Sequence, residues 1–310
     1  MLTVLQTALE VGLIYGLVAL ALFISFSILN IADLSTDGCF TLGCAVGAML
    51  TIAGHPILAL FAAMAAGMLS GYITAFLQTR LGVESILAGI ISNTGLYTIN
   101  LAVMGFSSNV SITGVDTVFS LFKGLVGGQW SRLILLALIA AVIVLVLIRF
   151  FGTSLGLSIR ATGDSLDMVS ASSINPKATI TIGLCLANAL TALSGCLIGE
   201  YNKFCDINLG TGMVTIALAS LIIGEVFAGR RGSVGKRVVC VVLGSIVYRF
   251  IIALALRLNI SAEYFKLVSA VIVAVAIAAP NMKDYVHLVK IKSNARKLRA
   301  LSGKGDETDA

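Results

Sequence analysis

Apolar segments separated by short polar ones run along most of the chain. Nine of them approach or exceed the roughly 20 residues that a helix needs to cross a bilayer. They cover residues 4–29, 37–54, 57–78, 84–104, 131–150, 179–199, 211–228, 236–257 and 264–280. The pattern predicts an all-α fold, a polytopic membrane bundle of about nine transmembrane helices, with eight or ten as the neighbouring counts.

One polar stretch between the apolar segments is rich in helix-forming residues. Ser158–Asn175 combines charged and hydroxyl side chains with apolar ones and predicts an amphipathic helix. A loop that only joins two membrane helices does not need such a helix, whereas a loop that docks against another protein does. We therefore expect the loop over residues 152–178 to contact a protein in the cytoplasm.

A second stretch between apolar segments, Gly105–Trp130, is mixed in character. Its apolar residues from Val118 to Val126 predict a short helix that lies at the membrane surface, closed by an interfacial tryptophan. A tenth, partial span is the alternative interpretation of this stretch.

Composition and charge place the chain in a membrane and orient it. It is 58% hydrophobic and 12% charged, whereas soluble domains carry about 25% charged residues. The net charge of +6 marks a cytoplasmic side and not a nucleic-acid site, because basic residues gather in cytoplasmic loops. Fifteen of the 21 lysines and arginines fall on the side of Ser158–Asn175 and the C-terminus. Residues 1–282 are thus predicted to form the membrane domain and residues 283–310 a cytoplasmic tail, basic and then acidic.

Small residues recur at four-residue spacing inside the apolar segments. Such pairs let helix backbones approach closely in a bilayer. We expect helix packing at Gly12/Gly16, Gly43/Gly47, Gly67/Gly71 and Gly195/Gly199.

A polar run, Asn30–Gly43, lies between the first two apolar segments. Asp33 or Ser35 is predicted to cap the following helix through its free backbone N–H groups, with Asp37 in the first turn. The alternative is a broken helix that lines a translocation route, since irregular backbone at membrane depth needs protein or water around it.

Other polar residues interrupt the spans themselves. Asn93, Tyr97 and Asn100 follow i, i+4, i+7 spacing and so share a predicted helix face. Hydrogen-bonded helix contacts and a polar stripe along a pathway both explain them. The candidate pathway residues are Asn30, Asp33, Ser35, Asp37, Asn93, Tyr97, Asn100 and Asn188.

Two charged residues inside apolar segments need partners. Glu225 is predicted to pair with Arg230 or Arg231, and Arg249 to face a water-filled cavity or backbone carbonyls. The six cysteines and two histidines show no metal-ligand spacing, and no nucleotide-binding or hydrolase motif is present. We expect neither a metal nor a cofactor, and no enzyme activity. If transport is driven by ATP, a separate subunit must hydrolyse it.

Four stretches resemble one family of membrane proteins. LNIADLSTDGCFTLG (29–43) is similar to the family pattern LNFPDLTVDGSFTLG, and LAGI (87–90) with LYTINLAVMG (96–105) to LAGI…LYSINLRIMG. RATGD (160–164) begins the cytoplasmic helix, and YRFIIALALRL (248–258) with FKLVSA (265–270) resembles the closing YRLIIALALRLG…LKLLTA. The family is that of ABC importer permeases of the branched-chain amino acid and sugar permease superfamily, and within it the tryptophan/tyrosine transport system permeases.

This resemblance implies a transport subunit in a bacterial cell membrane, with a cytoplasmic C-terminus. Its partners would be a cytoplasmic ABC ATPase, an extracellular or periplasmic substrate-binding protein, a second and identical permease copy, and the lipid bilayer. The solute would be an amino acid, possibly an aromatic one. A secondary transporter, or a sugar or nucleoside permease of the same superfamily, is the alternative. The residues that it implies for coupling to the ATPase are Arg160, Ala161, Thr162, Gly163, Asp164, Met168, Ala171, Ser172, Ile174 and Asn175.

Overall fold

The computed structural model describes residues 2–128, 130–229 and 232–257, with Val271 and Ala274. The ninth predicted segment, 264–280, and the tail over residues 283–310 therefore fall outside the described residues, apart from those two positions. So do Arg230 and Arg231.

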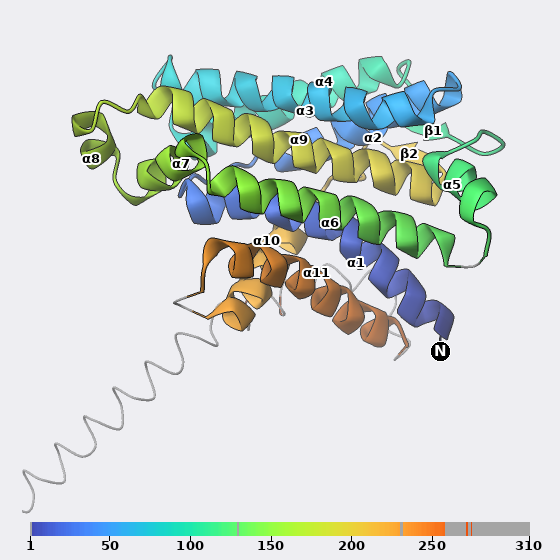
Figure 1. Cartoon of the computed structure of the whole chain (residues 1–310). Coiled ribbons are helices and arrows are strands. Elements are labelled where there is room, and N and C mark those ends of the chain that lie inside the picture. The colour runs from blue at the N-terminus through green and yellow to red at the C-terminus, as the bar shows by residue number, and fades with distance from the viewer. Residues whose placement is uncertain (1, 129, 230–231, 258–270, 272–273, 275–310) are drawn as a thin grey trace, which may run out of the picture.

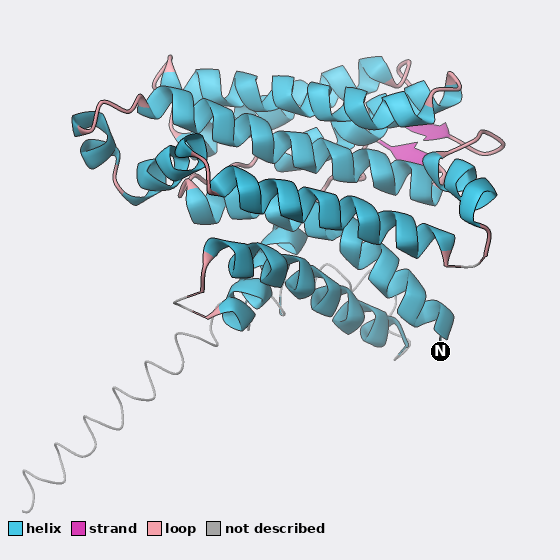
Figure 2. Cartoon of the chain, in the orientation of Figure 1, coloured by secondary structure: helices cyan, strands magenta, loops and turns pink. Residues whose placement is uncertain are grey.

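Helices make up most of the described chain (Figures 1 and 2). One short antiparallel ladder joins β1 (Asn109–Ser111) to β2 (Phe204–Asp206). The helices are α1 (Leu2–Leu22) with its π-helical continuation η1 (Phe23–Ile28), α2 (Thr36–Ile52), α3 (Pro56–Thr79), α4 (Ser85–Val103), α5 (Val118–Val126), α6 (Ser131–Phe151), α7 (Ser154–Asp164), α8 (Leu166–Ala171), α9 (Pro176–Asn202), α10 (Met213–Ala228) and α11 (Val234–Arg257).

Six of these helices are long and apolar enough to cross a membrane, and α2 and α10 are apolar but shorter. Together they coincide with the first eight predicted segments. Apolar runs predict helices well in a bilayer, because the backbone must satisfy its own hydrogen bonds where no water is available. The all-α, multi-pass bundle is confirmed, and the total of nine spans stays a prediction.

The bundle has a central helix and two distinct ends. In α9, 83% of the most apolar window is buried, against 22% in α6 and 28% in α4, so α9 is the core helix and α4 and α6 are peripheral. In Figure 1, α7 and α8 lie at the left end of the bundle, and α5, β1, β2 and the N-terminus lie at the right. We call these the α8 end and the α5 end.

The predicted glycine packing is confirmed between α2 and α9. A Cβ added to Gly43 would overlap the Ala192 carbonyl oxygen, and one added to Gly195 would overlap the Phe40 carbonyl oxygen. The two helices thus approach backbone to backbone, with glycines contributed from both sides. Gly67 and Gly71 of α3 meet the α9 backbone in the same way, at the Asn188 and Leu184 carbonyl oxygens, and Gly12 and Gly16 of α1 meet α11.

Two predictions about the polar loops meet different outcomes. The short helix within Gly105–Trp130 is confirmed as α5, which begins with a capping box between Thr117 and Ser120. The described part of this stretch contains no tenth span, only β1 and α5.

The single amphipathic helix predicted over Ser158–Asn175 is wrong. Two shorter helices, α7 and α8, stand in its place and are separated at Ser165. Ser165 adopts an extended backbone (φ −162°), and its Oγ accepts a hydrogen bond from the Met168 N–H. The serine ends one helix by capping the next, because its side chain competes with the helical backbone for hydrogen bonds.

Candidate translocation and coupling site

The chain breaks its helical path between η1 and α2. Residues 29–35 are irregular, and Asn30 adopts the left-handed conformation (φ 57°), which asparagine tolerates better than most residues. The π-helical turn η1 leads directly into this break. We call residues 29–35 the broken segment. It supplies the irregular backbone that the sequence offered as an alternative to a simple loop.

Asp33 is buried inside the bundle, with 3% of its surface exposed. Its Oδ1 accepts hydrogen bonds from the Ser35 backbone N–H at 2.9 Å and the Ser35 hydroxyl at 2.6 Å. Its Oδ2 accepts one from Asn188 Nδ2 at 2.9 Å. The predicted capping role is therefore wrong: Ser35 occupies the N-cap position of α2, but no side chain there bonds an α2 N–H group. The carboxylate instead bonds a side chain on α9.

The Asp33–Ser35–Asn188 cluster lies halfway along a candidate membrane span, because Asn188 is close to the middle of the 27-residue helix α9. Within the described chain, no lysine or arginine forms an ion pair with Asp33. A buried carboxylate without a cation is costly, and such a group in a membrane span is by default a functional-site hypothesis.

Helix α4 covers this cluster from one side. A Cβ on Gly89 would come within 2.7 Å of the Leu34 nitrogen, so the glycine lets α4 contact the broken segment. The Asn100 amide donates a hydrogen bond to the Gly38 carbonyl at 3.0 Å, and its Oδ1 is buried with no hydrogen-bond partner in the described part of the chain. Asn93 also faces Gly38. Asn93 and Asn100 thus hold α4 against the first turn of α2.

Tyr97 does not share the face occupied by Asn93 and Asn100. It is 51% exposed on the outside of the monomer, while Leu96 is buried between the two asparagines. The predicted common face is wrong for Tyr97, because 3.6 residues per turn carry the tyrosine past the line that joins residues 93, 96 and 100.

Asp37 has a structural partner outside its own helix. It lies in the first turn of α2, as predicted, and its carboxylate accepts hydrogen bonds from the backbone N–H groups of Gly212 (3.0 Å) and Val214 (2.9 Å). Those groups open α10, so Asp37 caps a helix that is distant in sequence. The capping contact fixes α10 to the first turn of α2.

Sequence reasoning did not include one polar row on α3. Ser70, Thr74 and Gln78 recur every four residues; Thr74 donates a hydrogen bond to the Ser92 hydroxyl of α4 at 2.9 Å, and Gln78 Nε2 is buried without a hydrogen-bond partner among the described residues. The i, i+4, i+8 spacing inside an apolar span is the signal that could have identified them.

A groove of about 640 Å³ opens at the α8 end, beneath the broken segment. It brings predicted residues of both kinds together, since Asn30 of the pathway set and Thr162, Gly163 and Asp164 of the coupling set line the same space. Gln78 joins them. The broken segment is therefore reached from the α8 end of the bundle, through this groove.

Helix α7 touches the broken segment directly. A Cβ on Gly163 would overlap the Ile28 carbonyl oxygen and come within 3.0 Å of the Leu29 Cα. The Thr162 hydroxyl lies 2.8 Å from the Thr179 hydroxyl and links α7 to α9. Glycine at 163 therefore permits a backbone contact between α7 and the end of η1.

The coupling residues that the resemblance implied divide into an inward and an outward group. Thr162 is buried, and Arg160, Ala161, Gly163 and Ile174 are half-buried. The exposed members are Asp164, Met168, Ala171, Ser172 and Asn175. Leu166 and Met168 of α8 are 54% and 57% exposed. The outward group thus combines polar groups with the apolar side chain of Met168, and Leu166, which is not in the predicted set, adds a second exposed apolar side chain beside it.

Each of the two charged residues within the spans has a described partner. Glu225 forms an ion pair with Arg237 of α11 at 2.6 Å, and Arg237 also contacts Ser27 of η1. The predicted pairing of Glu225 with Arg230 or Arg231 lies outside the described residues. Arg249 stacks over the Tyr15 ring, with Cζ 3.7 Å from the ring centroid, so one face of this cation lies against an aromatic ring. A water-filled cavity or backbone carbonyls around Arg249 stay a prediction.

These features define a class of protein: an integral membrane protein whose candidate spans enclose a helix broken at a buried polar cluster. The model of the family described as the branched-chain amino acid transport system permease component matches residues 4–277. The chain belongs to this family, which makes it a transport subunit.

Two relatives extend over most of the chain. A tyrosine transport system permease protein of Clostridioides difficile (strain R20291) is 31% identical over 272 residues, covering 87% of this chain and 89% of the relative. An uncharacterized protein of Rickettsia prowazekii (strain Madrid E) is 31% identical over 284 residues, covering 91% and 99%. No solved structure matches the chain.

Proposed function

We propose that the chain is the membrane-spanning subunit of an ATP-driven ABC importer that translocates an amino acid, with aromatic amino acids as the leading class. Membership of the permease family and the tyrosine permease relative support the proposal. The observation that carries the proposal is the contact of Gly163 with Ile28, because this contact joins α7 and α8, which have exposed side chains, to the broken segment.

The working cycle follows from this contact. A cytoplasmic ATPase binds the exposed side chains of α7 and α8 and moves them when it closes on ATP. Because α7 rests on the end of η1, its displacement passes to the broken segment and changes the position of Asp33 relative to Asn188. The groove at the α8 end then opens or closes towards the cytoplasm.

Asp33 would bind the ammonium group of the amino acid. Its carboxylate has three hydrogen-bond donors and no cation among the residues that the structure describes. A substrate ammonium near mid-membrane would supply the missing charge. The unpartnered oxygen of Asn100, on the other side of the start of α2, is a second polar group available in the same region.

The importer would need three further components besides this chain: a substrate-binding protein, a second permease copy and an ATPase. A substrate-binding protein delivers the solute at the α5 end, and a second identical copy completes the route. The α8 end and residues 283–310 face the cytoplasm of a bacterium, and residues 1–282 form the membrane domain. ATP hydrolysis belongs to the separate ATPase.

A secondary transporter is the second candidate, and Asp33 is the observation that favours it. Ion-coupled carriers hold ion ligands near mid-membrane at broken helices, and an uncompensated carboxylate there suits a sodium ion or a proton. A sugar or nucleoside permease of the same superfamily would need only the neutral donors and acceptors of the cluster.

Reconstituted transport separates these candidates. The chain would be purified with the co-expressed ATPase and binding protein, sealed into liposomes, and tested for uptake of labelled tyrosine. If the chain is an importer, uptake should require ATP on the side of the liposome membrane where the ATPase lies. Uptake should stop when the ATPase is inactivated. Uptake driven by an ion gradient without ATP would contradict it and favour the secondary transporter. ATP-dependent uptake of a labelled sugar or nucleoside, with no uptake of labelled tyrosine or any other labelled amino acid, would overturn the substrate class.

A further inference from the structure

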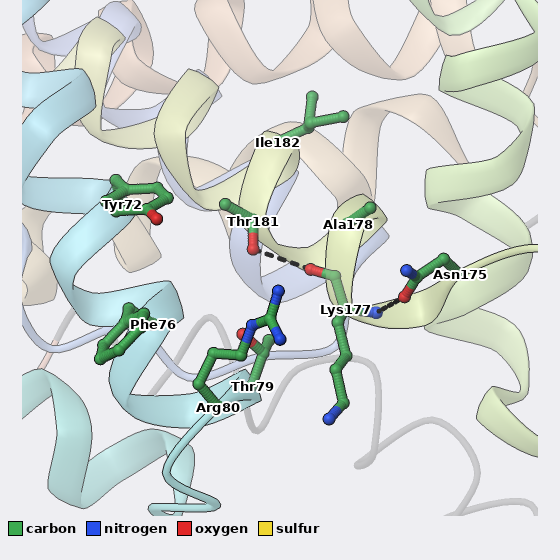
Figure 3. Close-up of a pocket in the computed structure, with 9 residues that line it drawn as sticks. All are labelled: Tyr72, Phe76, Thr79, Arg80, Asn175, Lys177, Ala178, Thr181 and Ile182. Atoms are coloured by element: carbon green, nitrogen blue, oxygen red, sulfur yellow. Dashed lines mark hydrogen bonds between the residues drawn. The ribbon is translucent and has the colours of Figure 1, made fainter.

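A second pocket lies outside the translocation site, at the α8 end of the bundle between α3 and α9. It has a volume of about 330 Å³. Figure 3 shows its nine lining side chains, with Tyr72 and Phe76 on α3 and Ala178, Thr181 and Ile182 on α9. The pocket sits where two membrane helices end, since Arg80 follows α3 and Lys177 lies in the first turn of α9.

Two cations and no anion line this pocket. Arg80 and Lys177 are both exposed, and neither forms an ion pair among the described residues. They come from different helices and meet at one pocket (Figure 3). The positive end of the 27-residue helix α9 and the negative end of α3 both lie at this pocket, so the two helix dipoles oppose each other. The positive charge of the pocket therefore comes from the Arg80 and Lys177 side chains, at the ends of two candidate membrane spans.

The pocket continues into an apolar surface. Tyr72 and Phe76 are 52% and 43% exposed, and Leu69 and Ile73, further along α3 towards the membrane centre, are 66% and 50% exposed. A soluble anion would use only the two cations, whereas a lipid would also use this surface. Basic pockets between transmembrane helices are known to hold anionic headgroups.

We propose that the α3–α9 pocket binds one anionic phospholipid, with its phosphate between Arg80 and Lys177 and its acyl chains along the exposed face of α3. The ligand class is a phosphodiester lipid. The site is separate from the groove beneath the broken segment, although Lys177 and Thr79 line both.

Native mass spectrometry of the purified full chain would test the site, with phosphatidylglycerol titrated against phosphatidylcholine in detergent. Each substitution, Arg80→Gln or Lys177→Gln, should weaken phosphatidylglycerol binding by about fivefold, and the pair by about 25-fold, from roughly 1 kcal/mol per basic residue. Arg149→Gln is the matched control, because Arg149 is an exposed arginine in the last turn of α6 at the same end and does not line the pocket. Its binding should stay at the wild-type value.

Three outcomes would overturn the assignment. One is wild-type binding in both single variants, and another is an equal loss in Arg149→Gln, which would indicate a diffuse surface charge. The third is displacement of the lipid by millimolar inorganic phosphate, which would make the pocket a site for a free anion. If the double variant does not fold, the two single variants carry the same comparison.

Discussion

Two close backbone contacts in this molecule use glycine in the same way and join different things. At Gly195, α9 lies against the Phe40 carbonyl of α2, and both partners are regular helices in the buried centre of the bundle. At Gly163, α7 lies against the Ile28 carbonyl, where η1 ends and the broken segment begins. Neither contact leaves room for a Cβ.

The difference lies in what surrounds each contact. The α2–α9 interface is repeated at successive glycines and is enclosed by α3, so neither helix can move without disturbing the core. The Gly163 contact is a single one, beside a groove of about 640 Å³. Close packing makes cores resist gradual deformation. The first contact thus holds the bundle together, and the second is placed to transmit movement.

The largest expected effect is loss of the folded bundle when the α2–α9 contact is blocked. Gly195→Leu puts a side chain into the Phe40 carbonyl, where backbone cannot retreat, and should cost upwards of about 4 kcal/mol, enough to remove most of a typical fold's stability. Detergent size-exclusion profiles should show aggregate in place of a monodisperse peak. The control is Gly95→Leu on α4, whose added Cβ would meet nothing within 4 Å. A monodisperse Gly195→Leu protein would contradict the rigid role of this contact.

Blocking the contact between Gly163 of α7 and Ile28 should change coupling and leave the fold intact. Gly163→Ala should leave a folded protein that still binds its ATPase, because α7 can shift at the surface. Uptake per ATP hydrolysed should fall by about 5- to 150-fold, the range of coupling energies of 1–3 kcal/mol. Uptake and hydrolysis would be measured on the same proteoliposomes.

Gly152→Ala is the matched control for the substitution at Gly163. It lies in the same loop, and its added Cβ would meet only the Arg149 and Ile148 carbonyls at 3.4 Å or more. Wild-type coupling is expected there. Equal losses in the two variants would show that the loop is merely sensitive to substitution and that the Gly163 contact has no special role.

The spans and their packing could be predicted from sequence because they depend on local composition. Apolar runs fix helices in a bilayer, and the pairs Gly43/Gly47 and Gly195/Gly199 mark surfaces that can approach closely. The break at Ser165 is local too, but the sequence allows either a continued helix or a cap. Only the tertiary contacts of α7 decide between them.

The polar site depended on partners that spacing cannot identify. Asp33 bonds Asn188, which lies 155 residues away, so a capping role and a role in the core were equally compatible with the local sequence. The pairing of Glu225 with Arg237 depends on how α10 and α11 pack against each other. The i, i+4, i+7 spacing grouped Tyr97 with two asparagines, although burial separates them.

A third prediction tests whether Asp33 serves transport or the fold. Asp33→Asn keeps the shape and removes the charge, and a flip of the Asn188 amide can restore the hydrogen bond between the two side chains. Uptake should fall by about tenfold or more, since a buried hydrogen bond to a charged group contributes roughly 1.5–3 kcal/mol. The melting temperature should hold or rise, because a buried unpaired carboxylate is lost.

Thr191→Val is the control for this substitution, because among the described residues the Thr191 hydroxyl bonds only the Ala187 carbonyl, within its own helix. It should change neither uptake nor melting. Normal uptake with a lowered melting temperature in Asp33→Asn would make the carboxylate a structural group, and the broken segment would then lack its proposed ligand.

The smallest effect is expected at the ion pair between Glu225 of α10 and Arg237 of α11, which also contacts Ser27 of η1. Arg237 and Glu225 keep 29% and 36% of their side-chain surface exposed, and solvated pairs of this kind contribute roughly 0–1 kcal/mol. A double-mutant cycle of Glu225→Gln and Arg237→Gln, followed by thermal melting, should give a coupling energy below about 1 kcal/mol. A coupling of several kcal/mol would mean that the pair behaves as a desolvated one. The end of η1 would then be anchored as firmly as the α2–α9 core, and movement of α7 could not reach the broken segment through it.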